Sequence, residues 1–511
     1  TAWQAPVSAN AAGWKAYLEN RRTKGFSVVQ TAPATQYTGP ITSFEQIGDC
    51  PSPAIPNDCS RWVPSYWQNL DALVEQANRS GIVVVLAGLI NPVGRGGGKS
   101  PQLYPALDDA AIFARNVAAR LAGNFVIFSP GFDDQVELPV AGGPATVRDS
   151  MEAVGRELEK VVPRHLVGNH LAGASPAEDY AVFEKQAWLD FQLFQSGHAL
   201  NSRACPDETR QQCAAQRARR LPEELRRLSQ EKPGINGEGA YEYPQDSSAV
   251  PPDNRFGVRQ TAYSSVLSGA LGFTLGVKGI FDWSDPMAVL DSPSSFDMVH
   301  LASRFRRRPW PEMVPVPERI LNNPAAPAQR KMALAGTSGF AVAYLPNNEA
   351  IEIATAGFPG LSCEPPWTKL WIDPRTGRTG LAEACTGSQE SITLARPRCT
   401  DPNPDVTGAC DWVLELRNTR STLAAGSEMQ VWTAIEPDGR TSAILARLAG
   451  RDFVVSPAGQ AFQDAPAASR DARGRFLVVW QSELPNGGTR TWGRRFDGAG
   501  RPLGPAFRMK K

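Results

Sequence analysis

The chain has 511 residues, of which 42% are hydrophobic and 21% are charged, and its formal net charge is +1 at pH 7. This length exceeds the roughly 250 to 300 residues that one hydrophobic core usually supports, so we expect two or three domains. The nearly balanced charge gives no field that would attract nucleic acid or an anionic membrane, and no stretch approaches the roughly 18 apolar residues of a membrane-spanning helix.

Up to about residue 300, short apolar β-rich runs alternate with longer segments of helical periodicity. Strands are predicted at residues 26–30, 81–90, 124–129, 165–170, 188–195, 233–238 and 272–283. Helices are predicted at residues 13–25, 66–81, 108–123, 145–162, 218–231 and 259–272. Because strands and helices alternate in this way, we predict a parallel sheet with helical crossovers.

A parallel sheet of this size is most simply a (β/α)8 TIM barrel, an α/β fold, which would occupy residues 1–310. Its first strand would end at residues 1–3, so the sequence would begin within that strand. A doubly wound open sheet is the alternative architecture.

Beyond residue 310 the pattern changes to one that is typical of antiparallel sheets. Alternating runs at residues 340–346, 350–356, 368–374 and 411–416 predict a β-sandwich over residues 311–426. In residues 427–511, VWTAIEPDGRTSAILARL from Val431 is weakly similar to VWQSELPNGGTRTWGRRF from Val479. Each copy combines a strand, a glycine turn and a returning strand, which predicts a short β-hairpin repeat module.

The eight cysteines occur without any Cys-x-x-Cys spacing, which argues against a zinc site and favours disulfides. They are neighbours along the chain as Cys50 and Cys59, Cys205 and Cys213, Cys363 and Cys385, and Cys399 and Cys410. Disulfides indicate an oxidising compartment, and a start at Thr1 without Met fits a processed export product. We therefore expect a secreted, periplasmic or cell-surface protein that needs no metal or other cofactor.

Polar residues stand where several predicted strands end, and in a parallel barrel these ends carry the chemistry. They are Gln30, Asp133, Asp134, Asn169, His170, Gln195, His198, Glu238 and Asp282. Two acids across the mouth of a barrel suit glycoside hydrolysis, in which retaining enzymes hold their carboxyl groups about 5 to 5.5 Å apart. Gly237 and Gly239 would leave room for a sugar beside Glu238, and Tyr241 would hold the orientation of the Glu238 carboxylate. The alternative is that Glu238 caps a turn or pairs with an arginine.

Other enzyme classes find little support in the sequence. GRGGGKS, at residues 94–100, lacks the glycine spacing of a phosphate-binding loop and is predicted to be a flexible loop. No Gly-x-Ser-x-Gly nucleophile elbow occurs, and no His-x-x-x-His pair is present to bind zinc on a helix.

The sequence resembles the apiosidase-like glycoside hydrolases, glycoside hydrolase family 140 and its relatives, some of which are labelled collagen-binding or collagenase-like. The similar stretches span about 430 residues in the same order. They are TAW at Thr1, YLENRRTKGFSVVQ at Tyr17, NFVIFSPGFD at Asn124, WLDFQLFQSGH at Trp188, KPGINGEGAYE at Lys232 and LWIDPRTGRT at Leu370. QSGH and the GE-x-x-YE element are the more specific of these.

The resemblance implies a barrel followed by a β-sandwich, and hydrolysis with retention of configuration. By position, Asp133 would be the acid/base and Glu238 the nucleophile. Pocket-lining positions are Trp3, Gln30, His170, Gln195, His198 and Tyr241. Phe132 replaces a glycine that the family usually has, and Asp134 adds a second acid, so the acid/base assignment stays open between Asp133 and Asp134, the other acid lining the pocket.

The predicted function is therefore a retaining glycoside hydrolase that acts on a complex polysaccharide or oligosaccharide, on a furanoside such as an apiosyl or arabinosyl unit. The inserts at residues 38–60 and 201–231 are not typical of the family, so the substrate need not be apiose. The alternative is a non-catalytic carbohydrate- or matrix-binding protein that uses the barrel as a scaffold.

Overall fold

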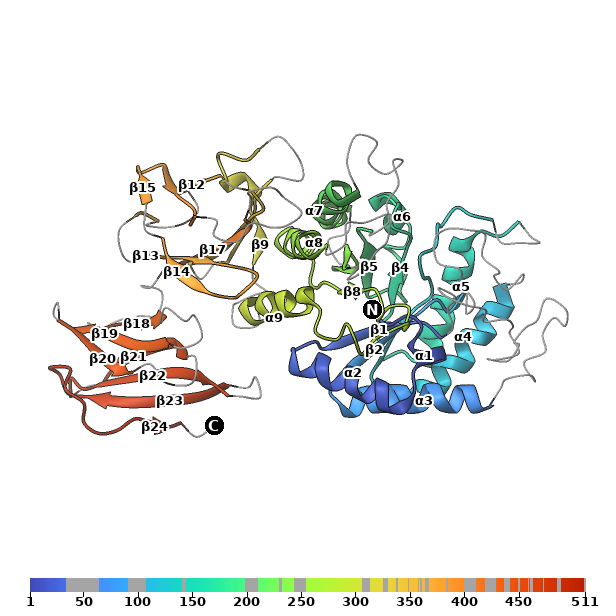
Figure 1. The fold of residues 1–511 in the computed structure, drawn as a ribbon, viewed down its shortest axis with the longest axis horizontal. Helices are drawn as coiled ribbons and strands as arrows, with labels where there is room; N and C mark the ends of the chain where they lie inside the picture. Colours follow the sequence, from blue (N-terminus) through green and yellow to red (C-terminus); the bar gives the residue numbers. More distant parts are fainter. Residues whose placement is uncertain are drawn as a thin grey trace. The chain divides into compact units, whose positions relative to one another are not determined.

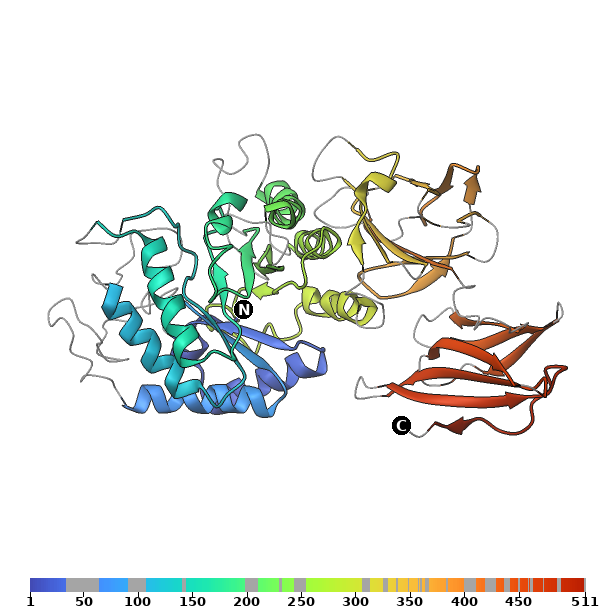
Figure 2. The ribbon, with the colours of Figure 1, turned by 180° about the vertical axis from the view of Figure 1, so that it is seen from behind.

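The structure is a computed structural model, drawn from two opposite sides in Figures 1 and 2, and it divides into two compact units, Thr1–Ala302 and Ser303–Lys511. It describes residues 1–33, 64–90, 107–139, 144–197, 210–228, 232–242, 254–305, 313–324, 330–336, 339–347, 349–356, 358, 361–363, 367–382, 385–398, 410–418, 429–435, 442–448, 451–457, 459, 463–471, 473–484 and 489–509. Within these residues, no helix combines the length and the apolar character needed to cross a membrane.

The first unit alternates helices and strands, as the sequence predicts. Its helices are α1 (Ala5–Ser8), α2 (Ala11–Thr23), α3 (Pro64–Arg79), α4 (Leu107–Leu121), α5 (Val147–Val161), α6 (Ala177–Ala181), α7 (Arg210–Leu228), α8 (Arg255–Leu267) and α9 (Pro293–Phe305). Its strands are β1 (Val28–Thr31), β2 (Val83–Ala87), β3 (Val126–Ser129), β4 (Gly168–His170), β5 (Phe191–Gln195), β6 (Gly234–Glu238), β7 (Tyr241–Glu242) and β8 (Gly276–Val277). The strand predicted at 272–283 is thus much shorter, and α1, α6, α9 and β7 were not predicted.

The strands of this unit pair in parallel. β1, β2 and β3 form one sheet, β4, β5 and β6 a second, and β7 and β8 a third. Isolated parallel bridges join Phe128 to Val167 and Asn236 to Phe273, between the sheets. At the start of the chain, the Thr1 nitrogen donates to the Leu275 carbonyl oxygen and the Ala2 nitrogen to that of Gln30. The backbone contacts therefore continue from one sheet to the next.

Helix α5 shows how the sequence fixes these elements. Thr146 accepts a hydrogen bond from the Asp149 nitrogen, while the Asp149 carboxylate accepts one from the Thr146 nitrogen, which is a capping box. Val147, Met151, Val154 and Leu158 follow at helical spacing and are all buried. Figure 1 shows α5 beside α4.

Two apolar clusters bring together residues from strands that are not neighbours in a sheet. One contains Val85 from β2 with Phe191 and Leu193 from β5, and partly buried Ile127 and Ile235 pack against it. The other lies nearer the strand ends and consists of Trp3, Ala32, Ala87, Phe132, Tyr241 and Phe281. Segments from both ends of the unit therefore share one interior.

The second unit is built from antiparallel strands. They are β9 (Val314–Pro315), β10 (Met332–Gly336), β11 (Phe340–Leu345), β12 (Ile351–Ala354), β13 (Trp367–Ile372), β14 (Thr379–Leu381), β15 (Cys385–Gly387), β16 (Ser391–Leu394), β17 (Trp412–Asn418), β18 (Gln430–Ile435), β19 (Ser442–Leu448), β20 (Arg451–Ser456), β21 (Gln463–Arg470), β22 (Phe476–Glu483), β23 (Thr489–Phe496) and β24 (Phe507–Arg508), with the 3₁₀ helix η4 (Pro317–Arg319). The antiparallel strands predicted at 340–346, 350–356, 368–374 and 411–416 are confirmed as β11, β12, β13 and β17.

The strands up to β17 form two sheets, in the orders β14-β13-β17-β11-β10-β9 and β12-β16-β15. Ala341, Leu345 and Trp371 from the first sheet share a buried cluster with Ile353 and Ile392 from the second. Two sheets that bury their facing side chains in this way form a layered β-structure.

The weak repeat corresponds to two antiparallel hairpins, β18–β19 and β22–β23. Trp432 pairs with Leu445 in the first and Trp480 with Trp492 in the second. Since Leu445 aligns with Gly493, the two registers differ by one residue. Antiparallel pairing of the two strands in each copy is therefore confirmed, although the repeat is not exact.

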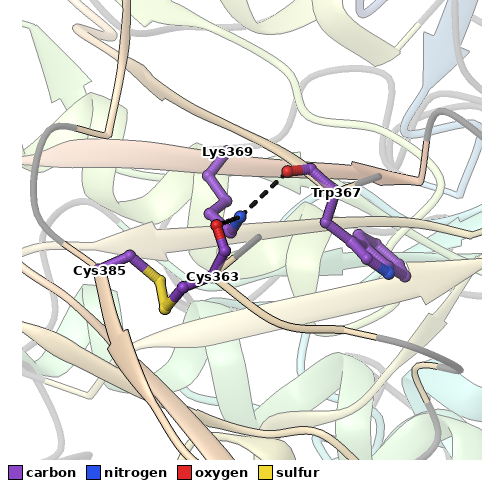
Figure 3. Close-up of a disulfide and its surroundings, with 4 residues drawn as sticks. All are labelled: Cys363, Trp367, Lys369 and Cys385. Atoms are coloured by element: carbon purple, nitrogen blue, oxygen red, sulfur yellow. Dashed lines mark hydrogen bonds between the residues drawn. A yellow bond between two sulfur atoms is a disulfide. The ribbon is translucent and has the colours of Figure 1, made fainter. Parts of the chain in front are cut away.

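A disulfide joins Cys363 to Cys385 in the second unit (Figure 3). The sequence predicted disulfides but not their pairing. Beside it, the Lys369 ammonium donates to the carbonyl oxygens of Cys363 and Trp367 at 2.8 and 3.0 Å. Cys213 and Cys410 are also disulfide-bonded. Cys50, Cys59, Cys205 and Cys399 lie outside the described residues.

Candidate active site

The predicted strand-end residues come from neighbouring strands of the first unit. Glu238 ends β6, His170 ends β4 and Gln195 ends β5, while Asp133 follows β3 by a short turn. Because parallel strands end at the same edge of a sheet, these side chains belong to one region of the molecule.

Glu238 is buried, at 1% exposure, and each of its carboxylate oxygens faces a potential donor. The Tyr241 hydroxyl donates to Oε1 at 2.7 Å, and Nε2 of His170 lies 3.5 Å from Oε2. Tyr241 therefore orients Glu238, as predicted, and no arginine is needed to explain the burial of this carboxylate.

Trp3 extends this arrangement by one step. Its indole Nε1 donates to the Tyr241 hydroxyl oxygen at 3.2 Å, and both side chains are buried. Since the Tyr241 hydroxyl has one proton, accepting from Trp3 leaves that proton for Glu238. The two aromatic residues thus form a directed chain of hydrogen bonds that ends on the carboxylate.

His170 connects Glu238 to the segment that holds Asp133. Its Nδ1 accepts a hydrogen bond from the Asp133 backbone nitrogen at 3.2 Å, so in the neutral ring the proton is on Nε2, which faces Glu238. Burial lowers the pKa of His170, against the opposing effect of the Glu238 charge. The imidazole is therefore neutral near pH 7, with Nε2 3.5 Å from a carboxylate oxygen of Glu238.

The segment after β3 has an unusual backbone. Asp133 has a φ of 58°, in the left-handed region, and its side chain is only partly buried. The next residue, Asp134, is 7% exposed, and its Oδ2 accepts from the Phe132 nitrogen at 2.8 Å. Burial raises the pKa of Asp134 to about 7. The two adjacent acids therefore occupy different environments.

Sequence reasoning missed two residues of this region. Phe132, noted only as a departure from the family, packs against Trp3 with ring centroids 4.2 Å apart and against His170 at 5.7 Å. Ser129 accepts from the His170 backbone nitrogen at 3.1 Å and donates to the Gly131 carbonyl oxygen at 2.8 Å. Its place at the end of β3 was the signal that could have identified it.

The predicted glutamines lie at the same strand ends. Gln195 pairs with Glu238 in the β5–β6 register, and its backbone nitrogen donates to the Tyr180 hydroxyl at 3.1 Å. Gln30 is buried in β1. His198 falls outside the described residues, so its prediction stays a prediction.

The prediction that the glycines beside Glu238 leave room for a sugar is wrong. A Cβ on Gly237 would lie 2.6 Å from Cγ of Leu193, and one on Gly239 would lie 2.4 Å from the Phe273 ring. Protein side chains therefore fill both spaces, and the glycines permit close packing of neighbouring strands.

Two other acids of the region have structural partners. Glu242, four residues after Glu238, accepts from the Ser294 nitrogen at 3.0 Å, at the start of α9. Asp282 accepts from the Gly279 nitrogen at 2.9 Å within a turn. Across the described ranges, no group of three or more His, Cys, Asp or Glu residues is placed to hold a metal ion.

Comparisons with known proteins found solved structures of similar fold and one matching family model. A solved structure titled glycoside hydrolase is 19% identical, with a TM-score of 0.62 over 82% of this chain and 92% of the other. A glycoside hydrolase family 5 structure from Bacteroides vulgatus is 19% identical, with a TM-score of 0.61 over 82% and 88%. At this identity the likeness shows a shared fold. The search of curated proteins gave no match. The model of the apiosidase-like catalytic domain matches residues 1–312, and the chain therefore belongs to the apiosidase-like glycoside hydrolase family.

Proposed function

We propose that this protein is a retaining glycoside hydrolase in which Glu238 is the nucleophile and Asp133 the acid/base. The observation that carries the proposal is the position of His170, whose two ring nitrogens face the Asp133 backbone and the Glu238 carboxylate. One imidazole ring thus separates the segment of one acid from the side chain of the other. Membership of a glycoside hydrolase family supports the reaction class.

The environment of Glu238 suits a nucleophile. A carboxylate attacks carbon only when it is ionised, and a hydrogen-bond donor on one of its oxygens favours the ionised form. Tyr241 is that donor, at 2.7 Å, and Nε2 of neutral His170 lies 3.5 Å from the other oxygen. Neither side chain carries a charge that would neutralise the carboxylate.

In the proposed reaction, a Glu238 oxygen attacks the anomeric carbon as the bond to the leaving-group oxygen breaks, and Asp133 gives its proton to that oxygen. The product is a covalent glycosyl-enzyme. Asp133, now a carboxylate, takes a proton from water, whose oxygen attacks the anomeric carbon and releases Glu238. The greater exposure of Asp133, compared with Asp134, fits a group that must exchange protons with solvent.

For the substrate, we propose a furanoside such as an apiosyl or arabinosyl unit of a complex polysaccharide or oligosaccharide. The family supports the sugar class. Trp3, Gln30, His170, Gln195, His198 and Tyr241 are proposed to line the sugar site. Among these, Gln30 has a buried amide nitrogen with no hydrogen-bond partner in the described part of the chain, which leaves it available for a sugar hydroxyl.

We also propose that the first unit is a closed (β/α)8 barrel, with a β-sandwich and a hairpin module after it near residues 310 and 427. Closure is supported by the clusters that combine β2 with β5 and by the bonds from residues 1 and 2 to Leu275 and Gln30. The Cys363–Cys385 disulfide supports a secreted, periplasmic or cell-surface location.

The function is tested by incubating the protein with pectic and arabinan glycans and analysing the sugars released. Wild type should release soluble sugar, and Glu238→Gln should lower turnover by at least about four orders of magnitude, as removal of a covalent nucleophile does elsewhere. Glutamine keeps the size and the hydrogen-bond acceptor of Glu238, so folding should be preserved. Binding without release by wild type would instead favour a carbohydrate-binding protein and overturn the proposal.

A further inference from the structure

We infer that Asp134 is a positioning residue, which braces the left-handed turn at Asp133 and through it fixes the tautomer of His170 that faces Glu238. Its effect on catalysis rests on the proposed function, whereas its effect on His170 does not. The sequence left open which of the two adjacent acids, Asp133 or Asp134, is the acid/base. The inference gives Asp134 a structural task instead.

The side chain of Asp134 spans the residue before it. Its Oδ2 accepts from the Phe132 nitrogen at 2.8 Å, so Asp133 lies inside a small ring closed by this hydrogen bond. Asp and Asn side chains often stabilise turns by such local bonds to the backbone. With one oxygen committed to the backbone and 7% exposure, this carboxyl group is poorly placed to exchange protons with a substrate.

The main chain of Asp134 is attached to the segment that follows His170. Asp134 forms a parallel bridge with Leu171, and its carbonyl oxygen accepts from the Ala172 nitrogen at 2.9 Å. The turn is therefore fastened on one side by its own side chain and on the other by the extension of β4. Movement of this turn would also move the contact with His170.

The backbone of Asp133 needs such support. Among the described residues, Asp133 and Trp283 are the non-glycine residues with positive φ. An L-residue in this region is strained unless its surroundings hold it there. The conformation directs the Asp133 N–H to Nδ1 of His170, at 3.2 Å.

The tautomer of His170 follows from this contact. While Nδ1 accepts from Asp133, the ring proton remains on Nε2, 3.5 Å from Oε2 of Glu238. If the turn relaxed, Nδ1 would lose its donor, and a proton on Nδ1 would leave Nε2 as an unprotonated nitrogen beside a carboxylate. The burial that raises the pKa of Asp134 to about 7 agrees with a structural carboxyl group.

The test compares Asp134→Asn, Asp134→Ala and Asp133→Asn. Asparagine at 134 retains an oxygen that can accept from the Phe132 nitrogen, whereas alanine does not. With 4-nitrophenyl arabinofuranoside as probe, Asp134→Asn should retain kcat/KM within about tenfold, and Asp134→Ala should lose more, in kcat rather than KM. Asp133→Asn should lose at least about a thousandfold with a natural glycan, because it has no proton to transfer.

A second measurement needs no substrate. In protein labelled with 15N at its four histidines, the His170 signals, assigned with His170→Gln, should show the Nε2–H tautomer in wild type and Asp134→Asn. Asp134→Ala should shift them toward a tautomer mixture. The inference is overturned if Asp134→Asn is as inactive as Asp133→Asn on the same natural glycan, or if Asp134→Ala keeps the wild-type His170 signals. If Asp134→Ala does not fold, Asp134→Asn alone decides. A tautomer change without any glycosidase activity would refute the proposed function and leave this inference standing.

Discussion

The hydrogen bond between Tyr241 and Glu238 offers a precise perturbation. Replacing Tyr241 with Phe removes one oxygen and leaves the ring, which is buried and packs against Phe281 with centroids 5.1 Å apart. That oxygen donates to Glu238 at 2.7 Å and accepts from Trp3 at 3.2 Å and from the Thr1 hydroxyl at 3.4 Å. The variant therefore loses these bonds with little change in shape.

The expected magnitudes follow from the bonds to Glu238 and Trp3. A hydrogen bond to a charged group contributes about 1.5 to 3 kcal/mol. If the transition state loses this stabilisation when the bond to Glu238 is removed, kcat/KM should fall about 10- to 100-fold. Removing the oxygen that accepts from the buried Trp3 indole N–H should lower the free energy of unfolding by about 1 to 3 kcal/mol.

The assay is steady-state hydrolysis of an aryl furanoside together with urea unfolding of the same preparations. Tyr66→Phe is the matched control, because the Tyr66 hydroxyl is buried in α3 and has no hydrogen-bond partner among the residues described. It should change the free energy of unfolding by less than about 0.5 kcal/mol and leave kcat/KM as in wild type. Equal kcat/KM for Tyr241→Phe and Tyr66→Phe would refute the claim that Tyr241 positions Glu238.

Three further predictions concern stability. Because the pKa of Asp134 is raised to about 7 in the folded chain, its stabilising contribution is complete below about pH 4 and is lost as the pH rises to about 7. Asp134→Asn should therefore gain stability relative to wild type by at least about 1 kcal/mol between pH 4 and pH 8 in urea unfolding, and a pH-independent difference would contradict this. Glu242→Ala removes the acceptor of the Ser294 N–H at the start of α9 and should cost about 1 to 2 kcal/mol by the same method, whereas Glu242→Gln should cost less. Replacing Cys363 and Cys385 together with Ser opens a loop with a sequence separation of 22 and should lower the stability of the second unit by about 3 kcal/mol, seen as an earlier calorimetric transition; an unchanged transition would show that the disulfide contributes little.

The sequence was most informative where one local pattern determines one element. The apolar run at residues 81–90 predicted β2, and the helical periodicity of residues 145–162 predicted α5. Each prediction is correct to within a few residues. Tyr241 was predicted to orient Glu238, three residues before it, and the hydrogen bond is present. Such contacts depend on short segments whose geometry is nearly fixed.

Contacts between distant segments were not predictable in the same way. Nothing in the residues around His170 indicates that its Nδ1 meets the Asp133 backbone, 37 positions earlier, or that Glu242 would cap α9, 52 positions later. The glycines beside Glu238 were misinterpreted for the same reason, since Leu193 and Phe273 come from neighbouring strands. The positive φ of Asp133 also depends on partners outside its own segment.

The central claim is that Glu238 becomes covalently bonded to the sugar. It is tested most directly by incubating the protein with an activated 2-deoxy-2-fluoro furanoside, which slows release of the glycosyl-enzyme, and mapping the labelled peptide by mass spectrometry. The account predicts the mass of one fluoroglycosyl group on the peptide that contains Glu238, and none on Glu238→Gln. Turnover of the natural glycan with inverted configuration, or a label on Asp133 or Asp134, would contradict it.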